Sequence, residues 1–336
     1  MTTSGADTAS WQYSTNGGTS WTTGSGTSFM VPDGTYAPNQ IQVRALDVAD
    51  NRAITNFGAL TVAKSMSEVV SYTQDATYTN SLNLYFDGSN NFDGALWNFS
   101  IAPIPLTAKV NGVSRDVTYT VKDWTDSSMF VELGMTPLPL TDVITISYVD
   151  PNPGVSNSGD RILKDLAGNE SPSFNVYIGG TANNNLVGTT DKDIFFGGTG
   201  NDTMTGGGGS NTYNWLSGDA GAANSTNIAT DTIKGFSAWN ASTSSGDKLN
   251  IASLLDHGRY TNLTGSGFFN SILTGQTVGG VANCTVIDID TNGWWTGGPT
   301  QKIVLEGVNL LTQAGISTFN YDQMVTQLVS KGILIA

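Results

Sequence analysis

Four consecutive nine-residue blocks, residues 179–187, 188–196, 197–205 and 206–214, share one pattern of residue types. Their early positions are rich in glycine, which supplies the positive φ angles of tight turns. The sixth residue of each block brings a side-chain oxygen to the turn, and these residues are Asn184, Asp193, Asp202 and Asn211. The eighth residue is apolar or aromatic in every block: Leu186, Phe195, Met204 and Tyr213. Carboxylate, amide and main-chain oxygens on stacked turns could surround a hard cation such as calcium, which takes about six to eight oxygen ligands.

The third block, GGTGNDTMT, follows the pattern Gly-Gly-x-Gly-x-Asp-x-apolar-x in full and resembles the nonapeptide repeat of RTX (repeats-in-toxin) proteins. The resemblance implies a short calcium-binding parallel β-roll. It also implies that the second and fourth residues of each block lend carbonyl oxygens to calcium: Gly180, Ala182, Thr189, Asp191, Gly198, Gly200, Gly207 and Gly209. Ala182, Thr189 and Asp191 depart from the pattern's glycines. A flexible glycine-rich linker is the alternative, which four in-phase blocks with an apolar eighth residue disfavour.

Two blocks are expected to form one coil of the roll, so that equivalent turns recur at every second block. This spacing predicts that Asn184 lies near Asp202 and that Asp193 lies near Asn211. Each predicted pair contains one aspartate and one asparagine. We therefore expect each pair to bind calcium more weakly than two aspartates would, because affinity depends on the charge of the ligands.

The segment after the blocks also resembles RTX proteins, which commonly continue with Asp-x-Ile-x-x-Phe and then Gly-Asp-x-Leu-x-apolar. Asp231 and Asp247 occupy the matching positions, where the resemblance implies that they cap the roll and are available as calcium ligands. Turn or strand-start aspartates are an equal alternative. The stretch DIDTNG, residues 288–293, begins like an EF-hand loop, but Pro299 replaces the glutamate needed at the twelfth position. A hairpin turn is favoured there, and a calcium contact stays open.

Residues 179–336 as a whole resemble the C-terminal target domain of type I secretion substrates, which include large RTX adhesins. The resemblance implies a type I secretion exporter as partner and a secreted, extracellular or bacterial cell-surface location. It also accounts for the first ten residues, MTTSGADTAS, which show neither the basic nor the apolar region of a signal peptide. No apolar run approaches the length of about 18 residues that indicates a membrane-spanning helix, so no membrane insertion is expected.

Residues 1–64 and 66–177 read as two β units because short alternating runs are separated by glycine, proline and asparagine turns. The first resembles bacterial Ig-like repeats through its Trp-x-Tyr-Ser-x-x-Gly-Gly and Val-Arg-x-x-Asp motifs, and we expect it to lack its first strands. The second resembles such repeats more weakly. The predicted fold is all-β: tandem Ig-like β-sandwich units, then a short calcium-binding parallel β-roll within a β-rich C-terminal secretion domain, residues 179–336.

Composition excludes several classes of function. The net charge of −14 argues against nucleic-acid binding, and the single Cys284 excludes an internal disulfide framework. An enzyme is not expected, because His-Glu-x-x-His and Gly-x-Ser-x-Gly motifs are absent and His257 is the only histidine. A carboxylate pair for glycoside cleavage is left open, since such pairs meet only in the fold.

The favoured interpretation is the C-terminal region of a secreted, calcium-dependent RTX adhesin, a monomeric segment of a longer chain. A structural surface-layer or matrix protein and the non-catalytic end of a larger RTX enzyme are the alternatives. A cell-surface glycan or peptide is the expected ligand, and the middle unit is its expected site because of its longer loops and aromatic residues: Tyr78, Tyr85, Trp97 and Trp124. The turn clusters at 86–94 and 150–160 are candidates for calcium between domains, with ordinary turn chemistry slightly favoured.

Overall fold

The computed structural model forms two compact units, residues 1–66 with 164–170 and residues 67–163 with 171–336. The predicted boundary near residue 178 therefore falls inside the second unit. The residues that the structure describes are 8–24, 29, 31, 34–47, 51–62, 68–74, 80–86, 105–121, 128–134, 138, 141–151, 163, 171–222, 228–240, 242–243, 245–255, 269–291, 298–316 and 321–335.

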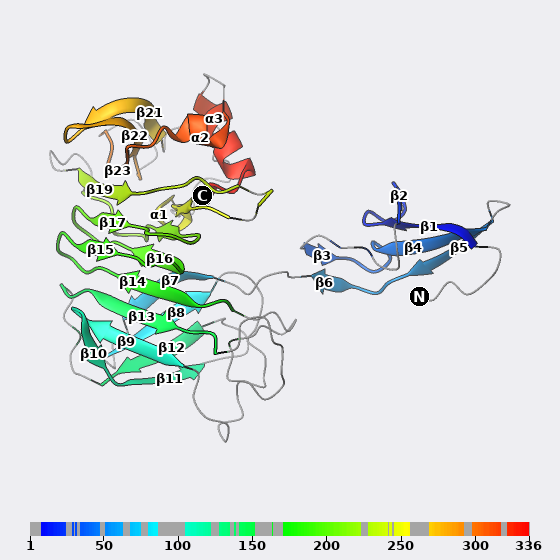
Figure 1. Ribbon diagram of the computed structural model, residues 1–336, viewed down its shortest axis with the longest axis horizontal. Helices are drawn as coiled ribbons and strands as arrows, with labels where there is room; N and C mark the ends of the chain where they lie inside the picture. The colour runs from blue at the N-terminus through cyan, green and yellow to red at the C-terminus, as the bar shows by residue number, and fades with distance from the viewer. Residues whose placement is uncertain are drawn as a thin grey trace. The chain divides into compact units, whose positions relative to one another are not determined.

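The first unit contains a small antiparallel sheet in the order β2-β1-β4-β5 (Figure 1). Its strands are β1 (Thr8–Ser14), β2 (Thr22–Thr23), β4 (Gln42–Asp47) and β5 (Arg52–Asn56), and β3 (Gly34–Tyr36) pairs separately with β6 (Leu60–Val62). The Asp47 carboxylate accepts hydrogen bonds from the backbone N–H of Asn51 at 2.8 Å and from its Nδ2 at 2.7 Å, which links the end of β4 to the residue before β5. The expected short antiparallel strands are present, while the Ig-like assignment stays a prediction.

An eight-stranded sheet runs through the second unit in the order β10-β9-β13-β14-β16-β18-β20-β24. The bounds are β9 (Leu106–Val110), β10 (Val113–Arg115), β13 (Ile144–Tyr148), β14 (Phe174–Ile178), β16 (Lys192–Phe196), β18 (Thr212–Asn214), β20 (Lys248–Asn250) and β24 (Leu334–Ile335). Pairing is antiparallel from β10 to β14 and parallel from β14 to β24. β14 thus joins the antiparallel strands to the first coil of the roll.

Two further sheets complete the second unit. One is antiparallel in the order β11-β12-β8-β7, with β7 (Val69–Gln74), β8 (Ser81–Phe86), β11 (Val117–Val121) and β12 (Ser128–Leu133). The other has the order β15-β17-β19-β23-β22-β21, with β15 (Asn185–Val187), β17 (Thr203–Thr205), β19 (Ala229–Lys234), β21 (Phe269–Val278), β22 (Val281–Ile289) and β23 (Gln301–Glu306). β15, β17, β19 and β23 pair in parallel and form the second wall of the roll, which confirms the predicted β-roll.

The predicted all-β fold left out helices that lie toward the C-terminal end. They are α1 (Ala252–Leu255), α2 (Leu310–Ala314) and α3 (Tyr321–Ser330). In α3, Met324, Val325 and Leu328 are buried, and this spacing of three and four residues is helical. The sequence predicted only a β-rich secretion domain for this end of the chain. No helix among the described residues is long and apolar enough to cross a membrane.

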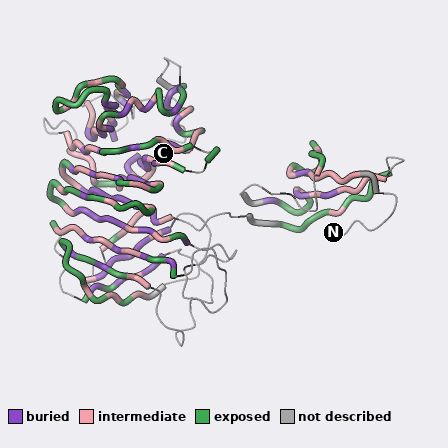
Figure 2. Tube along the Cα trace, viewed as in Figure 1, coloured by how far each residue is buried: buried purple, intermediate pink, exposed green. Residues whose placement is uncertain are grey.

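The core of the roll is built from the eighth residues of the four blocks, as predicted. Leu186, Phe195, Met204 and Tyr213 are each at most 1% exposed. The rings of Tyr177, Phe195 and Tyr213 stack along the roll with centroids 5.0 Å apart at each step. Buried stretches alternate with exposed turns along the roll strands (Figure 2). Because Tyr177 belongs to β14, the core continues across the predicted boundary.

Candidate calcium site

Equivalent turns of the roll stack with the predicted offset of two blocks, which is 18 residues. Asn185 pairs with Thr203 on one wall, and Ile194 pairs with Thr212 on the other. The next coil is longer: the hydrogen bond from Asp202 to Asp231 spans 29 residues and that from Asn211 to Asp247 spans 36. The stack of turns therefore extends one step beyond the four blocks on each side.

Asn184, Asp202 and Asp231 form one line of side chains, which we call the A ladder. The backbone N–H of Asn184 donates to Oδ1 of Asp202 at 2.7 Å, and the backbone N–H of Asp202 donates to Oδ1 of Asp231 at 2.8 Å. The structure thus places Asn184 beside Asp202 as expected. It also brings Asp202 beside a second aspartate, Asp231. The sequence had instead predicted pairs of one aspartate and one asparagine.

Asp193, Asn211 and Asp247 form the equivalent B ladder on the other side of the roll. The N–H of Asp193 donates to Oδ1 of Asn211 at 3.1 Å, and the N–H of Asn211 donates to Oδ1 of Asp247 at 2.9 Å. Asn175 precedes the ladder and donates from Nδ2 to Oδ1 of Asp193 at 2.8 Å. Asn175 was not among the predicted ligands, although its position two block lengths before Asp193 was an available signal.

Main-chain carbonyls of one coil lie directly against glycines of the next coil. A Cβ atom added at Gly198, Gly207 or Gly209 would collide with the carbonyl oxygen of Gly180, Thr189 or Asp191, respectively. At Gly200 it would lie 2.9 Å from the carbonyl oxygen of Ala182. All four glycines have the positive φ that the sequence predicted. The residues predicted to lend carbonyl oxygens are therefore packed at the turns, beside the two ladders.

The carboxylate of Asp202 is the least satisfied of those on the ladders. Asp202 is 1% exposed, and its Oδ2 atom has no hydrogen-bond partner. Burial, together with the negative charges of Asp231 and Asp219, raises the pKa of Asp202 to about 7, although the N–H of Asn184 opposes the rise. A buried carboxylate of this kind is costly without a compensating positive charge.

The other ladder aspartates are better satisfied. Asp193 accepts hydrogen bonds from the N–H of Thr189 at 2.6 Å and from Asn175, and Asp247 accepts from the N–H of Ser237 at 2.8 Å and of Asn211. Burial raises the pKa of both carboxyls, and these hydrogen bonds oppose the rise.

Asp231 is also well satisfied. Its Oδ2 accepts hydrogen bonds from Trp215 Nε1 at 2.7 Å and from Gln301 Nε2 at 2.9 Å, while Oδ1 accepts from the N–H of Asp202. Burial raises the pKa of Asp231 to about 6 despite these three donors.

The chemistry of the turns fits calcium rather than a metal bound by side chains alone. Within the described part of the chain, no three His, Cys, Asp or Glu side chains gather as a metal site. A cation would therefore need main-chain carbonyl oxygens in addition to carboxylates, and calcium accepts that mixture. The buried, unpartnered oxygen of Asp202 and the carbonyls packed at the neighbouring turns provide it.

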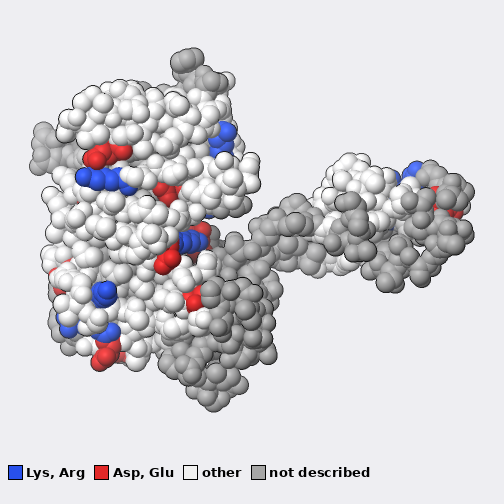
Figure 3. Space-filling view, in the orientation of Figure 1, with Lys and Arg blue, Asp and Glu red and all other residues white. Residues whose placement is uncertain are grey.

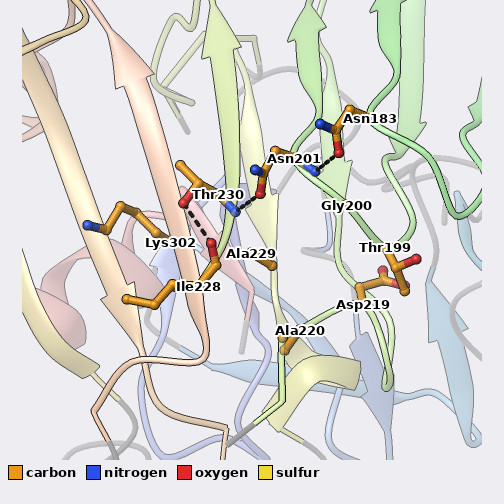
Figure 4. A pocket seen from close by; sticks show the side chains of 11 residues that line it. Asn183, Thr199, Gly200, Asn201, Asp219, Ala220, Ile228, Ala229, Thr230 and Lys302 are labelled. Carbon is orange, nitrogen blue, oxygen red and sulfur yellow. Dashed lines mark hydrogen bonds between the residues drawn. The ribbon is translucent and has the colours of Figure 1, made fainter. Parts of the chain in front are cut away.

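A polar hollow of about 750 Å³ opens beside the turns of the A ladder. Asn183, Asn201 and Thr230 follow its wall as an outer line: the N–H of Asn201 donates to Asn183 Oδ1 at 2.9 Å, and the N–H of Thr230 donates to Asn201 Oδ1 at 2.8 Å (Figure 4). Asp219 and Lys302 also line the hollow. Figure 3 shows few charged groups on the visible face of the described residues. Acidic and basic groups are interspersed there, and they form no extended basic patch.

Other candidates from the sequence are not members of the ladders or lie outside the described residues. Asp288 accepts from Ser271 Oγ at 2.6 Å and pairs with Lys302 at 3.6 Å. Tyr85 shares a hydrogen bond of 3.3 Å with Thr73. The remaining candidates lie outside the described residues: Tyr78, Trp97, Trp124, His257, and nearly all of the turn clusters at 86–94 and 150–160.

One comparison, with a protein-family model, agrees with the chemistry of the turns. No curated protein matches the chain. Among solved structures, the solution structure of the AlgE6R3 subunit from the Azotobacter vinelandii mannuronan C5-epimerase aligns with 43% of this chain and 70% of its own, at 21% identity and a TM-score of 0.28. Residues 178–213 match the family model of the RTX calcium-binding nonapeptide repeat in four copies. The chain therefore contains calcium-binding RTX repeats, a kind of repeat typical of secreted proteins.

Proposed function

We propose that this chain is the C-terminal region of a secreted bacterial adhesin, in which calcium folds the roll and the upstream β units are presented outside the cell. The observation that carries the calcium-triggered part is the buried Asp202 carboxylate with an unpartnered oxygen. Without a cation this charge opposes folding, and the glycine-rich turns are costly to order. A ligand that binds only the folded state stabilises that state.

The first experiment compares the full chain in calcium and in excess chelator by circular dichroism and thermal melting. We expect chelator to reduce the β signal of the roll and to lower its melting temperature. Magnesium at the same ionic strength is the control, because its smaller octahedral shell suits carbonyl-rich turns poorly. Equal folding and equal thermal stability in calcium and in chelator would refute calcium-triggered folding.

Export is a separate part of the proposal, supported by the resemblance of residues 179–336 to type I secretion substrates. A reporter fused ahead of residues 179–336 is expected to leave a cell that carries a matching exporter. Deleting residues 320–336, which removes α3 and β24, should retain the reporter inside the cell. Unchanged secretion after this deletion would place the export signal elsewhere.

Attachment is tested with the purified chain against cell surfaces, glycans and peptides. Calcium-dependent retention on one of these surfaces would support an adhesin. Calcium-driven assembly of the protein into sheets, without such retention, would instead support a surface-layer protein.

A further inference from the structure

At the end of the A ladder, one aspartate has a carboxylate oxygen without a hydrogen-bond partner, and the next aspartate has both oxygens hydrogen-bonded. Asp202 Oδ2 is buried without a partner, whereas both oxygens of Asp231 already accept hydrogen bonds. The Trp215 and Gln301 donors hold the Asp231 carboxylate in place. A cation that compensates Asp202 at this end of the roll would therefore be held more tightly with a second carboxylate ligand from another segment.

Asp219 supplies such an oxygen from outside the four blocks. It lies in the segment that follows β18, where its Oδ2 accepts the N–H of Leu216 at 2.7 Å and its own N–H donates to the Leu216 carbonyl at 3.1 Å. These two bonds form a tight turn that fixes the carboxylate. Among the described residues, its Oδ1 makes no hydrogen bond.

The position of Asp219 brings it to the turn that carries Asp202. It lines the polar hollow together with Thr199, Gly200 and Asn201, the three residues that immediately precede Asp202. Figure 4 shows the Asp219 side chain next to Thr199. A cation between the buried, unpartnered oxygen of Asp202 and the carboxylate of Asp219 would compensate both negative charges at once.

We propose that Asp202 and Asp219 bind one calcium ion at the end of the A ladder, with carbonyl oxygens of the 197–202 turn as further ligands. The inference rests on the proposed calcium function and adds a ligand that lies outside the repeats. Because the site holds two charged ligands, it binds calcium more tightly than a turn with one aspartate and one asparagine. Because Asp219 lines a hollow that opens at the surface, the ion also ties the segment after β18 to the roll.

The test titrates the full chain, stripped with chelator, with calcium in a calorimeter. Asp219→Asn keeps an acceptor for the Leu216 N–H but removes the charge. We expect this variant to bind one ion fewer, or to bind that ion about tenfold more weakly or worse. Glu306→Gln is the matched control, because it removes another partly exposed carboxylate, paired with Lys234 at 3.7 Å, and should leave the titration unchanged.

Three outcomes separate the inference from the proposed function. Loss of an ion in both Asp202→Asn and Asp219→Asn supports the shared site. Loss in Asp202→Asn alone overturns the role of Asp219 and leaves the calcium function intact. No change in either variant overturns both.

Circular dichroism at saturating calcium checks that each variant folds. If Asp219→Asn does not fold, Asp219→Glu decides, because it keeps the charge but moves the oxygens by one methylene group. An altered affinity for one ion is expected in Asp219→Glu, and an unaltered titration would overturn the proposal.

Discussion

The A ladder and the B ladder arise from the same nine-residue pattern but surround their carboxylates differently. On the B ladder, donors from the protein reach both oxygens of Asp193 and of Asp247. On the A ladder, Asp202 keeps one buried oxygen without a partner. The B ladder is thus largely satisfied by the protein itself, whereas the A ladder depends on an added cation. Calcium dependence is therefore expected to be concentrated on the A side of the roll.

Glu68 adds a second difference, because it links strands of the B ladder to one another. Its carboxylate pairs with Lys192 at 2.7 Å and with Lys248 at 3.9 Å, and accepts a hydrogen bond from Thr212 Oγ1 at 2.9 Å. These three partners immediately flank Asp193, Asp247 and Asn211 in the chain. One side chain thus ties together β16, β18 and β20, the three successive B-side strands.

The largest effect on calcium binding is expected from Asp202→Asn. The variant removes the buried charge that a cation would neutralise, so calcium affinity should fall by about tenfold or more. Folding in chelator should improve at the same time, because the cost of the unpaired charge is gone. Calcium titration and thermal melting in chelator measure the two effects. Loss of stability in chelator would contradict the assignment of Asp202 as the unsatisfied carboxylate.

Asp193→Asn should instead lower the stability of the fold, whether or not calcium is present. An amide cannot accept at both positions, so one of the donors from Thr189 or Asn175 loses its acceptor. We expect a loss of about 1–3 kcal/mol in the free energy of unfolding, in calcium and in chelator alike. Chemical denaturation under both conditions gives the comparison. A loss seen only in calcium would show that the B ladder depends on the ion as the A ladder does.

Glu68→Gln tests how much the ion pairs of Glu68 stabilise the fold and how this stabilisation depends on pH. Burial alone would raise the pKa of Glu68, but Lys192 and Lys248 together hold it below the ordinary value of 4.5. The stabilisation is therefore complete above that value and is lost as the pH falls through the lowered pKa of the folded state. We expect the variant to lose about 1–2 kcal/mol at neutral pH and progressively less in acid. Denaturation midpoints between neutral pH and pH 3 measure the difference, and a constant difference would exclude the ion pairs as its cause.

The sequence predicted the first step of each ladder because an unbroken run of nine-residue blocks, two to a coil, fixes which turns stack. The sequence did not predict the offsets of the second step, which are 29 and 36 residues, because they depend on the lengths of the intervening segments. Glu68 had no local signal at all, because it lies 144 residues from Thr212 in the chain. The predicted boundary near residue 178 likewise separated Asn175 and Tyr177 from the roll, although both contact it.

Ala182→Gly should have the smallest effect, and its direction is informative. The change restores the repeat consensus at the fourth position of the first block, but Ala182 is not among the residues with positive φ. Glycine would therefore relieve no strain and would only add freedom to the unfolded chain. We expect a loss of about 0.5–1 kcal/mol in the free energy of unfolding, with calcium affinity unchanged because the carbonyl oxygen remains. Denaturation and calcium titration check both parts. A gain in stability would mean that the first turn is strained like the turns stacked on it, where Gly198 and Gly200 need a positive φ.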